Sequence, residues 1–377
     1  MELLDNPIQR YAWGSPTAIP TLLGKAPDGT PQAELWLGAH PSAPSRLRTG
    51  NSLEELISEA PQRLLGDDSL DRFGPRLPFL LKVLAAGQPL SLQAHPSLDQ
   101  ARVGFAREEM AGVPLGAPHR NYKDANHKPE ILCALTEFHA LCGFRKVSES
   151  VRLFAALGLE TSLLMDKGLK AYFEFVMTQP TEAQGALVDR LVEAARKPVK
   201  GFEAECQLAT RLNALYARDV GIIGAMLLNL VTLQPGEALY LGAGNLHAYL
   251  EGTGVELMAN SDNVLRGGLT PKHVDVPELL SVLNFTDGPP EILKPSPQPE
   301  AVYRTSAPDF RLSRIAVVGK PVTLPARGAQ VLLVVEGEVL VKGMKLRCGS
   351  SVFIGADEGA VAISGTGTVF RATPGNV

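Results

Sequence analysis

A polar and apolar alternation between Gly87 and His95 brings together side chains that could bind a metal ion. The segment reads GQPLSLQAH. Successive side chains of a β-strand face opposite sides, so Ser91, Gln93 and His95 would share one face. An amide oxygen and an imidazole nitrogen aimed at one point suit a metal. The alternative is an edge strand whose polar face meets water.

A second segment, from Gly236 to His247, combines a strand, a glycine-rich turn and a histidine. It resembles the second signature motif of the cupin superfamily, with Gly242 in place of the usual proline and Glu251 in place of the final asparagine. The earlier segment resembles the first cupin motif, with Gln93 where a histidine is usual. Two matching halves of one metal-barrel pattern favour a metal site over a solvated edge strand.

The glycines of the same turn allow a rival interpretation, the start of a dinucleotide-binding fingerprint. That fingerprint needs a third glycine where His247 stands, within a strand–helix–strand unit. The sequence has neither feature, so this interpretation is disfavoured.

A third polar segment, from Asn121 to Glu130, leads into an apolar run and completes a set of motifs. With it the chain resembles the type I mannose-6-phosphate isomerases, whose motifs follow in the same order from near residue 6 to beyond Asp275. The most distinctive match runs from Met258 to Lys272, and the C-terminal region matches in architecture only. The other matching segments are Asn6–Gln9, Tyr11–Ser15, Gln93–Pro96, Asn126–Glu130 and Gly242–Tyr249.

The resemblance implies one Zn²⁺ per chain, held by Gln93, His95, Glu130 and His247. Four nitrogen and oxygen ligands leave room for water or a sugar oxygen, as a catalytic site requires. The general cupin motif would instead place its acidic ligand where Asp99 stands. We follow the family and predict that Asp99 is a solvated residue at the start of a helix.

The resemblance also implies catalytic side chains beside this metal. Glu256 alternates with apolar neighbours and would face the same interior, which makes it the candidate base. A glutamate on a surface strand is the alternative. By resemblance, Arg266 is assigned to developing negative charge, and Lys128 is placed among the catalytic residues.

Further side chains are assigned to a phosphorylated sugar, again by resemblance. They are Lys82, Ser91 and Lys272, which we assign to the phosphate. Lys82 interrupts an apolar run and could also extend outward to solvent. His127 is left open between a substrate contact and a hydrogen bond within its loop.

The activity implied is the interconversion of mannose 6-phosphate and fructose 6-phosphate through an enediol. Such a reaction needs a base, a group that stabilises the enediolate oxygen, and cations for the phosphate. Two alternatives keep the fold. An iron oxygenase of the cupin superfamily is disfavoured by Gln93 and by the phosphate-type cations. A non-catalytic sugar-binding cupin is disfavoured by Glu256 beside a complete ligand set.

Composition sets limits on partners and location. The 377 residues carry 36 basic and 40 acidic side chains without a basic run, so we expect neither nucleic-acid binding nor electrostatic membrane attachment. The N-terminus does not have the form of a secretory signal, and the longest apolar stretch, residues 221–233, is too short to span a bilayer. Four cysteines without a C-x-x-C pair indicate free thiols in a reducing cytoplasm. Family resemblance suggests a monomer.

The pattern along the chain predicts a mainly β protein with a helical insert. Abundant glycine and proline, 36 and 29 residues, favour short strands and turns. We expect a catalytic cupin-like jelly-roll barrel from residues 1–146 and 218–290, a helical insert at 147–217, and a second cupin-like barrel at 291–377. The second barrel would have no metal site, because no histidine follows His273.

Several elements are specific enough to test. Helices are expected near residues 52–60 and 97–109, and after Pro180, where Thr181 and Gln184 have the spacing of a capping box. A strand is expected at Met226–Leu233. The C-terminal region should contain separate strands at 331–335 and 339–341, after a proline-rich connector at 287–301.

Overall fold

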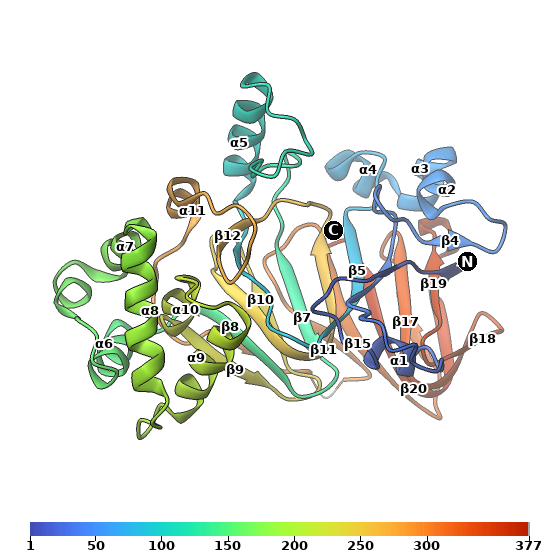
Figure 1. The fold of residues 1–377 in the computed structure, drawn as a ribbon. Coiled ribbons are helices and arrows are strands. Elements are labelled where there is room, and N and C mark those ends of the chain that lie inside the picture. Colours follow the sequence, from blue (N-terminus) through green and yellow to red (C-terminus); the bar gives the residue numbers. More distant parts are fainter. Residues whose placement is uncertain (297, 376–377) are drawn as a thin grey trace.

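The computed structural model describes residues 1–296 and 298–375, and it is built on two β-sheets with helices gathered at one end and along the top (Figure 1). Pro297, in the expected connector, and residues 376–377, at the end of the expected second barrel, lie outside the described residues. The expected division into domains stays a prediction.

The first sheet surrounds the residues singled out above, and 11 strands of the described chain belong to it. Its long strand β11 (His247–Ala259) pairs with β6 and β8 near its beginning and with β5 and β7 near its end. The other strands are β2 (Ile8–Gln9), β3 (Glu34–Leu37), β5 (Phe79–Ala86), β6 (Leu92–Ala94), β7 (Glu130–Ala134), β8 (Phe138–Phe144), β9 (Leu228–Leu233), β10 (Ala238–Leu241), β12 (Leu265–Gly268) and β13 (Ile292–Leu293).

An irregularity in β11 decides which of its side chains share the interior. His247 and Glu256 are nine residues apart, so strict alternation would send them to opposite faces. The pairing with β8 shifts register between Tyr249 and Glu251. Such a bulge adds one residue and reverses the alternation beyond it. His247, Tyr249 and Glu256 consequently all line one interior.

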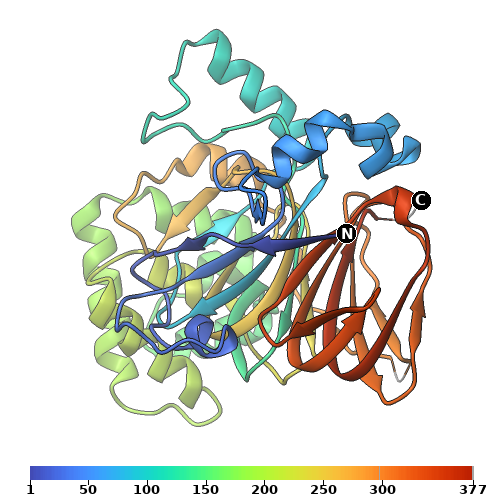
Figure 2. The ribbon, with the colours of Figure 1, turned by 90° about the vertical axis from the view of Figure 1, so that its right-hand side faces the viewer.

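The second sheet contains nine strands of the described chain and includes the N-terminus. β1 pairs with β19 and β4, so the first residues, predicted from sequence to belong to the catalytic barrel, share a sheet with C-terminal strands. Figure 2 shows this N-terminal strand extending to the C-terminal strands. The members are β1 (Glu2–Asp5), β4 (Arg46–Leu47), β14 (Glu300–Tyr303), β15 (Arg311–Val318), β16 (Val322–Leu324), β17 (Gln330–Val341), β18 (Met344–Arg347), β19 (Ser351–Ile354) and β20 (Val361–Thr373).

Most of the helices lie at one end of the molecule or along its top, and α1 lies near its lower edge (Figure 1). Helices α6 to α10 cover the end of the first sheet that is remote from the second, and their apolar faces share a core with Leu92 and Phe144. The bounds are α1 (Ala18–Leu22), α2 (Leu53–Glu59), α3 (Pro61–Leu65), α4 (Asp67–Phe73), α5 (Leu98–Met110), α6 (Val147–Ala156), α7 (Ser162–Thr178), α8 (Thr181–Ala195), α9 (Glu203–Leu215), α10 (Gly221–Met226) and α11 (Val276–Val282), with a 3-10 turn η1 (Ala356–Glu358).

The expected helices α2, α5 and α8 are confirmed, and three finer predictions are wrong. The α8 capping box is absent: the N-cap is Pro180, and the Gln184 amide donates instead to two carbonyls at the end of α7. Met226 ends helix α10, and the strand begins at Leu228. The two expected C-terminal strands form one strand, β17, in which a bulge and Gly337 at φ +73° absorb the polar interruption.

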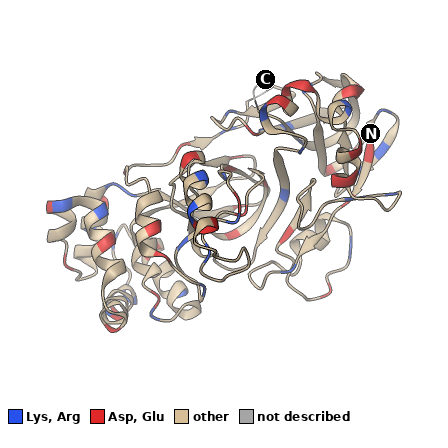
Figure 3. Cartoon of the chain, turned by 90° about the horizontal axis from the view of Figure 1, so that it is seen from above, with Lys and Arg blue, Asp and Glu red and all other residues tan. Residues whose placement is uncertain are grey.

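No helix among the described residues is long and apolar enough to cross a membrane. Figure 3 shows acidic and basic residues interspersed over the upper face. The four cysteines are free thiols, as predicted.

Candidate metal centre and substrate cavity

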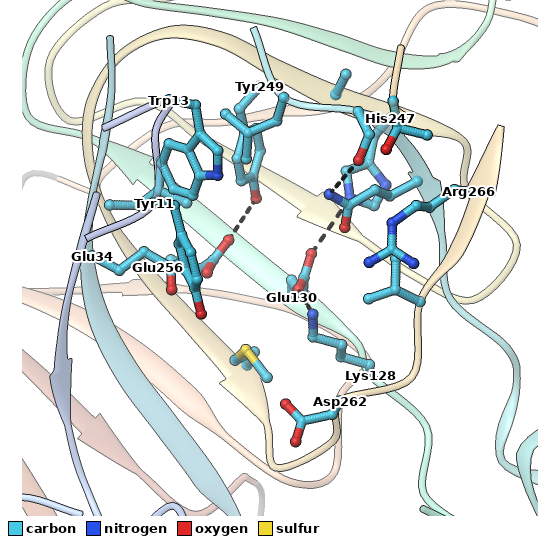
Figure 4. Close-up of a pocket in the computed structure, with 18 of the residues that line it drawn as sticks. Tyr11, Trp13, Glu34, Lys128, Glu130, His247, Tyr249, Glu256, Asp262 and Arg266 are labelled. Atoms are coloured by element: carbon cyan, nitrogen blue, oxygen red, sulfur yellow. Dashed lines mark hydrogen bonds and ion pairs between the residues drawn. The ribbon is translucent and has the colours of Figure 1, made fainter. Parts of the chain in front are cut away.

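The first sheet curves around a cavity of about 550 Å³. It brings together most of the predicted site residues, and Figure 4 shows Glu130, His247 and Glu256 among the side chains that meet there. His95 lies directly behind the wall, with 1% of its side chain exposed. The predicted residues that line the cavity are Lys82, Ser91, Gln93, Lys128, Glu130, His247, Glu256, Arg266 and Lys272.

Two histidines are held in the same tautomer by the backbone. His95 Nδ1 lies 2.7 Å from the carbonyl oxygen of Asn263, and His247 Nδ1 lies 2.9 Å from that of Asn245. A carbonyl can only accept, so Nδ1 carries the proton and Nε2 keeps its lone pair. Both Nε2 atoms face one oxygen of Glu130, at 3.3 and 3.5 Å.

This arrangement fits a divalent cation. The donor atoms of His95, Glu130 and His247 all lie within 4.8 Å of one another, and all three residues are buried. His95 Nε2 has no hydrogen-bond partner. Burial, offset in part by Glu130, lowers the pKa of His95 to about 4, so the ring is neutral near pH 7. Lone pairs that face a carboxylate repel it, and a cation between them removes the conflict.

The carboxylate of Glu130 is ionised for a different reason. Burial alone would raise its pKa, but Lys128, 3.1 Å from its second oxygen, holds that pKa well below the ordinary value. Lys128 therefore neutralises Glu130 from the cavity side. Its side chain also lines the cavity (Figure 4).

The fourth expected ligand, Gln93, lies beside the same cluster. On the sheet it pairs with His247 on one side and Arg266 on the other. Its amide nitrogen donates to the Ser91 hydroxyl at 3.2 Å, which leaves the amide oxygen free to bind a cation. Asp99, the rival acid, is exposed in the first turn of α5. The geometry therefore brings Glu130, and not Asp99, beside the histidines.

Glu256 is buried in a network of its own on the other side of the cavity. One oxygen accepts from the Tyr249 hydroxyl at 2.9 Å, and the other lies 3.2 Å from Lys82 Nζ. Burial raises the pKa of Glu256; Lys82 opposes the rise, and the carboxylates of Glu130 and Glu34 add to it. A carboxylate of raised pKa that faces a cavity is typical of a general base.

Lys82 forms ion pairs with two buried carboxylates, Glu34 and Glu256. Burial by itself would lower its pKa, yet Glu34 at 3.6 Å and Glu256 raise the pKa above the ordinary value. Its ammonium also lies 5.3 Å from the ring centre of Trp36. Most of its charge is thus balanced by protein carboxylates, which weakens its assignment to phosphate.

Sequence reasoning missed Glu34 and Tyr249, which complete this network. Glu34 and Trp36 occupy alternate positions of β3, both line the cavity, and the Trp36 indole donates to Glu34 at 2.7 Å. The alternation of Glu34, Leu35 and Trp36 along a strand could have predicted this, because it places Glu34 and Trp36 on one face and the buried Leu35 on the other. Tyr249 gave no such signal, since its orientation relative to Glu256 depends on the bulge.

We expect Lys82→Met to lower the free energy of unfolding by about 3 kcal/mol at pH 7.5, because it leaves two buried carboxylates without their cation. Burial already raises the pKa of Glu256 and Lys82 opposes that rise, so without Lys82 its folded-state pKa lies further above its unfolded value. The loss of stability should therefore shrink as the pH falls through that raised pKa and Glu256 takes up a proton. Urea denaturation of metal-free protein at pH 7.5 and 5 measures both effects.

The double variant Lys82→Met/Glu34→Gln provides the control, since it removes one carboxylate together with the cation. It should recover part of the lost stability. If the free energy of unfolding falls equally at both pH values and does not recover in the double variant, unbalanced charge is not the cause of the instability.

Arg266 and Lys272 form a second cationic group on the wall opposite Tyr11 and Trp13. Figure 4 shows Arg266 on that side of the cavity. Burial lowers the pKa of both cations, and Arg266 lowers that of Lys272 further. Neither makes an ion pair with a residue in the described part of the chain. Two adjacent cations that lack a protein carboxylate are suited to an anionic ligand.

His127 is not among the described residues that line the cavity. Its Nε2 lies 2.7 Å from the carboxylate of Asp309, which is buried between β14 and β15. The two roles left open from sequence were a substrate contact and a hydrogen bond within its loop. The hydrogen bond that the structure shows joins His127 to a distant segment instead.

The chain was compared with known proteins. Residues 1–147 match the family model for the catalytic domain of type I phosphomannose isomerase. The sequence is 40% identical, over 391 residues, to the mannose-6-phosphate isomerase of Salmonella typhimurium, covering 98% of this chain and 99% of that protein. The structure matches that of a point mutant of the Salmonella typhimurium phosphomannose isomerase with a TM-score of 0.93, 38% identity and full coverage of both chains. It matches a zinc-bound mannose 6-phosphate isomerase with a TM-score of 0.91 and 37% identity, covering 100% of this chain and 99% of the other.

Proposed function

The chain belongs to the type I phosphomannose isomerase family, and we propose that it interconverts mannose 6-phosphate and fructose 6-phosphate with one Zn²⁺. The observation that carries the proposal is one cavity in which a His–Glu–His cluster and a separate buried carboxylate, Glu256, face each other. The zinc-bound relative supports the choice of metal.

The metal would be held by His95, Glu130 and His247, with the Gln93 amide oxygen as fourth ligand. Zn²⁺ bound there supplies a Lewis acid for the oxygens on C1 and C2 of the open-chain sugar. The donor set of two imidazoles, a carboxylate and an amide is the nitrogen and oxygen mixture that zinc accepts.

The proton transfer is assigned to Glu256. Its carboxylate takes the proton from C2 of the aldose, while water in the cavity gives a proton to the C1 oxygen, so that the enediol forms. The protonated carboxyl group then gives a proton to C1, and the O2 hydroxyl returns its proton to water to leave the ketone. Tyr249 and Lys82 hold the carboxylate in place through the whole sequence.

The remaining cations divide between the sugar and its phosphate. Arg266 and Lys272, with the Ser91 hydroxyl, are proposed to bind the phosphate, because they lack protein counterions. Lys128 lies at the metal side, where it can stabilise negative charge on the sugar oxygens. Arg266 pairs with Gln93 on the sheet, so it stays close enough to the metal side to act on developing charge as well.

Three further features of the proposal concern the whole chain. The two curved sheets are assigned to cupin-like jelly rolls, the first catalytic and the second without metal ligands. We place the enzyme in the cytoplasm, in agreement with its four free thiols. It is proposed to act as a monomer on a small-molecule substrate.

The experiment that tests the function is an anaerobic assay with mannose 6-phosphate and quantitative metal analysis. We expect fructose 6-phosphate to form without oxygen, a chelator to abolish turnover, and added Zn²⁺ to restore it at one ion per chain. Dependence on dioxygen would identify a cupin oxygenase instead. Tight sugar binding without turnover would identify a non-catalytic sugar-binding protein.

A further inference from the structure

A second cavity, of about 320 Å³, opens between helices α3 and α4 and one end of the second sheet. Its described lining shares no residue with the metal-centre cavity. In Figure 2 the helices of residues 53–73 lie across the end of the C-terminal sheet. The cavity therefore belongs to the half of the molecule to which the proposed function assigns no ligand.

Two arginines line this cavity and form no ion pair with a described residue. The Nε atoms of Arg311 and Arg327 are buried and have no hydrogen-bond partner. One oxygen of the nearby Glu300 carboxylate accepts from Arg371 at 2.9 Å and from Ser313 at 2.8 Å, and no ion pair joins Glu300 to Arg311. Burial lowers the pKa of Arg311, Arg327 lowers it further, and Glu300 offsets the shift in part.

A buried hydroxyl lies in the same wall. Ser69, on α4, is 3% exposed, and its Oγ has no hydrogen-bond partner. Buried polar atoms are rarely left unsatisfied, so an unpaired hydroxyl beside two unpaired guanidinium groups indicates a missing acceptor. Gly328 brings the Arg327 loop close to α3: at φ +68° a Cβ there would lie 3.3 Å from the Leu65 carbonyl oxygen.

The cavity also has an acidic rim. Asp67 and Asp68 line it and are exposed, and Asp67 accepts from Gln62 at 2.8 Å. Neither aspartate forms an ion pair with the arginines. Carboxylates at the rim disfavour a bare anion, but they are good acceptors for hydroxyl groups.

We propose that this cavity is a second, non-catalytic binding site for a small phosphorylated polyol. Arg311, Arg327 and Ser69 hold its phosphate, and the two aspartates at the rim accept from its hydroxyls. Planar guanidinium groups bind phosphate oxygens in pairs, which suits two arginines in one wall. The site needs nothing from the metal centre, so it goes beyond the proposed function and does not depend on it.

Equilibrium dialysis with glycerol 3-phosphate tests the site on the zinc-loaded full chain. We expect two sites per chain, one in each cavity. Arg311→Gln and Arg327→Gln should each weaken the second site about tenfold or more, because a charged hydrogen-bond pair is lost. Arg314→Gln is the matched control, since it removes the same charge from the same strand but does not line the cavity.

Turnover of mannose 6-phosphate shows whether each variant is folded and should not change, since none of these arginines belongs to the proposed catalytic machinery. A single site that the Arg311 and Arg327 variants leave intact would overturn the proposal. Inorganic phosphate that binds the second site as tightly as glycerol 3-phosphate would overturn the polyol assignment. Binding that arises only in a chain shortened to end at Gly375 would mean that the chain's own end competes for the cavity, and the proposal would fail.

Discussion

Glu130→Ala is expected to strip zinc from the chain and to reduce turnover below detection. Loss of a group that merely supports a metal ligand already lowers metal affinity about 10- to 100-fold, so loss of a ligand should lower it by at least about 100-fold. The change also removes the carboxylate that both histidine Nε2 atoms face, and it leaves the buried Lys128 without its ion-pair partner. Metal content after dialysis and competition titration with a chromogenic chelator measure the loss.

Asp99→Ala is the matched control, because both variants replace an acid by alanine and Asp99 is the residue that the general cupin pattern would favour. It should keep one zinc per chain and normal turnover, since Asp99 is exposed in the first turn of α5. A site emptied by Asp99→Ala but filled in Glu130→Ala would mean that the general motif, and not the family motif, identifies the ligand.

This contrast shows what sequence could contribute to the metal centre. Period-two alternation grouped Gln93 with His95, and the glycine-rich turn indicated His247, both before any fold was known. Neither rule shows which strands become neighbours in the sheet. Spacing in the sequence alone therefore could not decide whether Glu130 or Asp99 is the acidic ligand. The choice required either a family resemblance or the pairing of β7 with β11, which is a contact between distant segments.

Electrostatic roles were the hardest part to predict. Lys82 was assigned to phosphate by resemblance, because sequence alone left open whether it extends to solvent or into a polar cavity. Its environment turned out to be two carboxylates, Glu34 and Glu256, on neighbouring strands. Sequence shows that a buried charge needs a partner, but it does not show which partner the sheet order brings beside it.

Local rules failed in the same way at the level of secondary structure. Thr181 and Gln184 have the spacing of a capping box, but carbonyls at the end of α7 compete for the glutamine amide. The strand β1 could not be assigned to the second sheet, because its partner β19 is about 350 positions away in sequence. Tertiary contacts decided both outcomes, and the bulge in β11 is a further case.

The bulge is what makes Glu256 a testable base, because it brings the carboxylate to the same interior as the metal ligands. Glu256→Gln keeps the size of the side chain and can still accept from Tyr249, but the amide cannot take up a proton. We expect zinc content and substrate affinity near normal, with kcat lowered about 100-fold or more. Exchange of the C2 hydrogen with deuterated solvent should slow to the same extent.

The pH dependence separates a base from a merely structural carboxylate. Glu256 acts as a base only when ionised, and its pKa is raised, so kcat of the unaltered enzyme should fall as the pH drops through that raised value. The residual activity of Glu256→Gln should lack this acidic limb, because glutamine does not titrate. Glu34→Gln is the matched control: it alters the same network, yet it should keep the limb, moved to lower pH since one nearby negative charge is gone. Unchanged turnover in Glu256→Gln would shift the role of base to Lys128, and loss of zinc would place Glu256 in the metal shell.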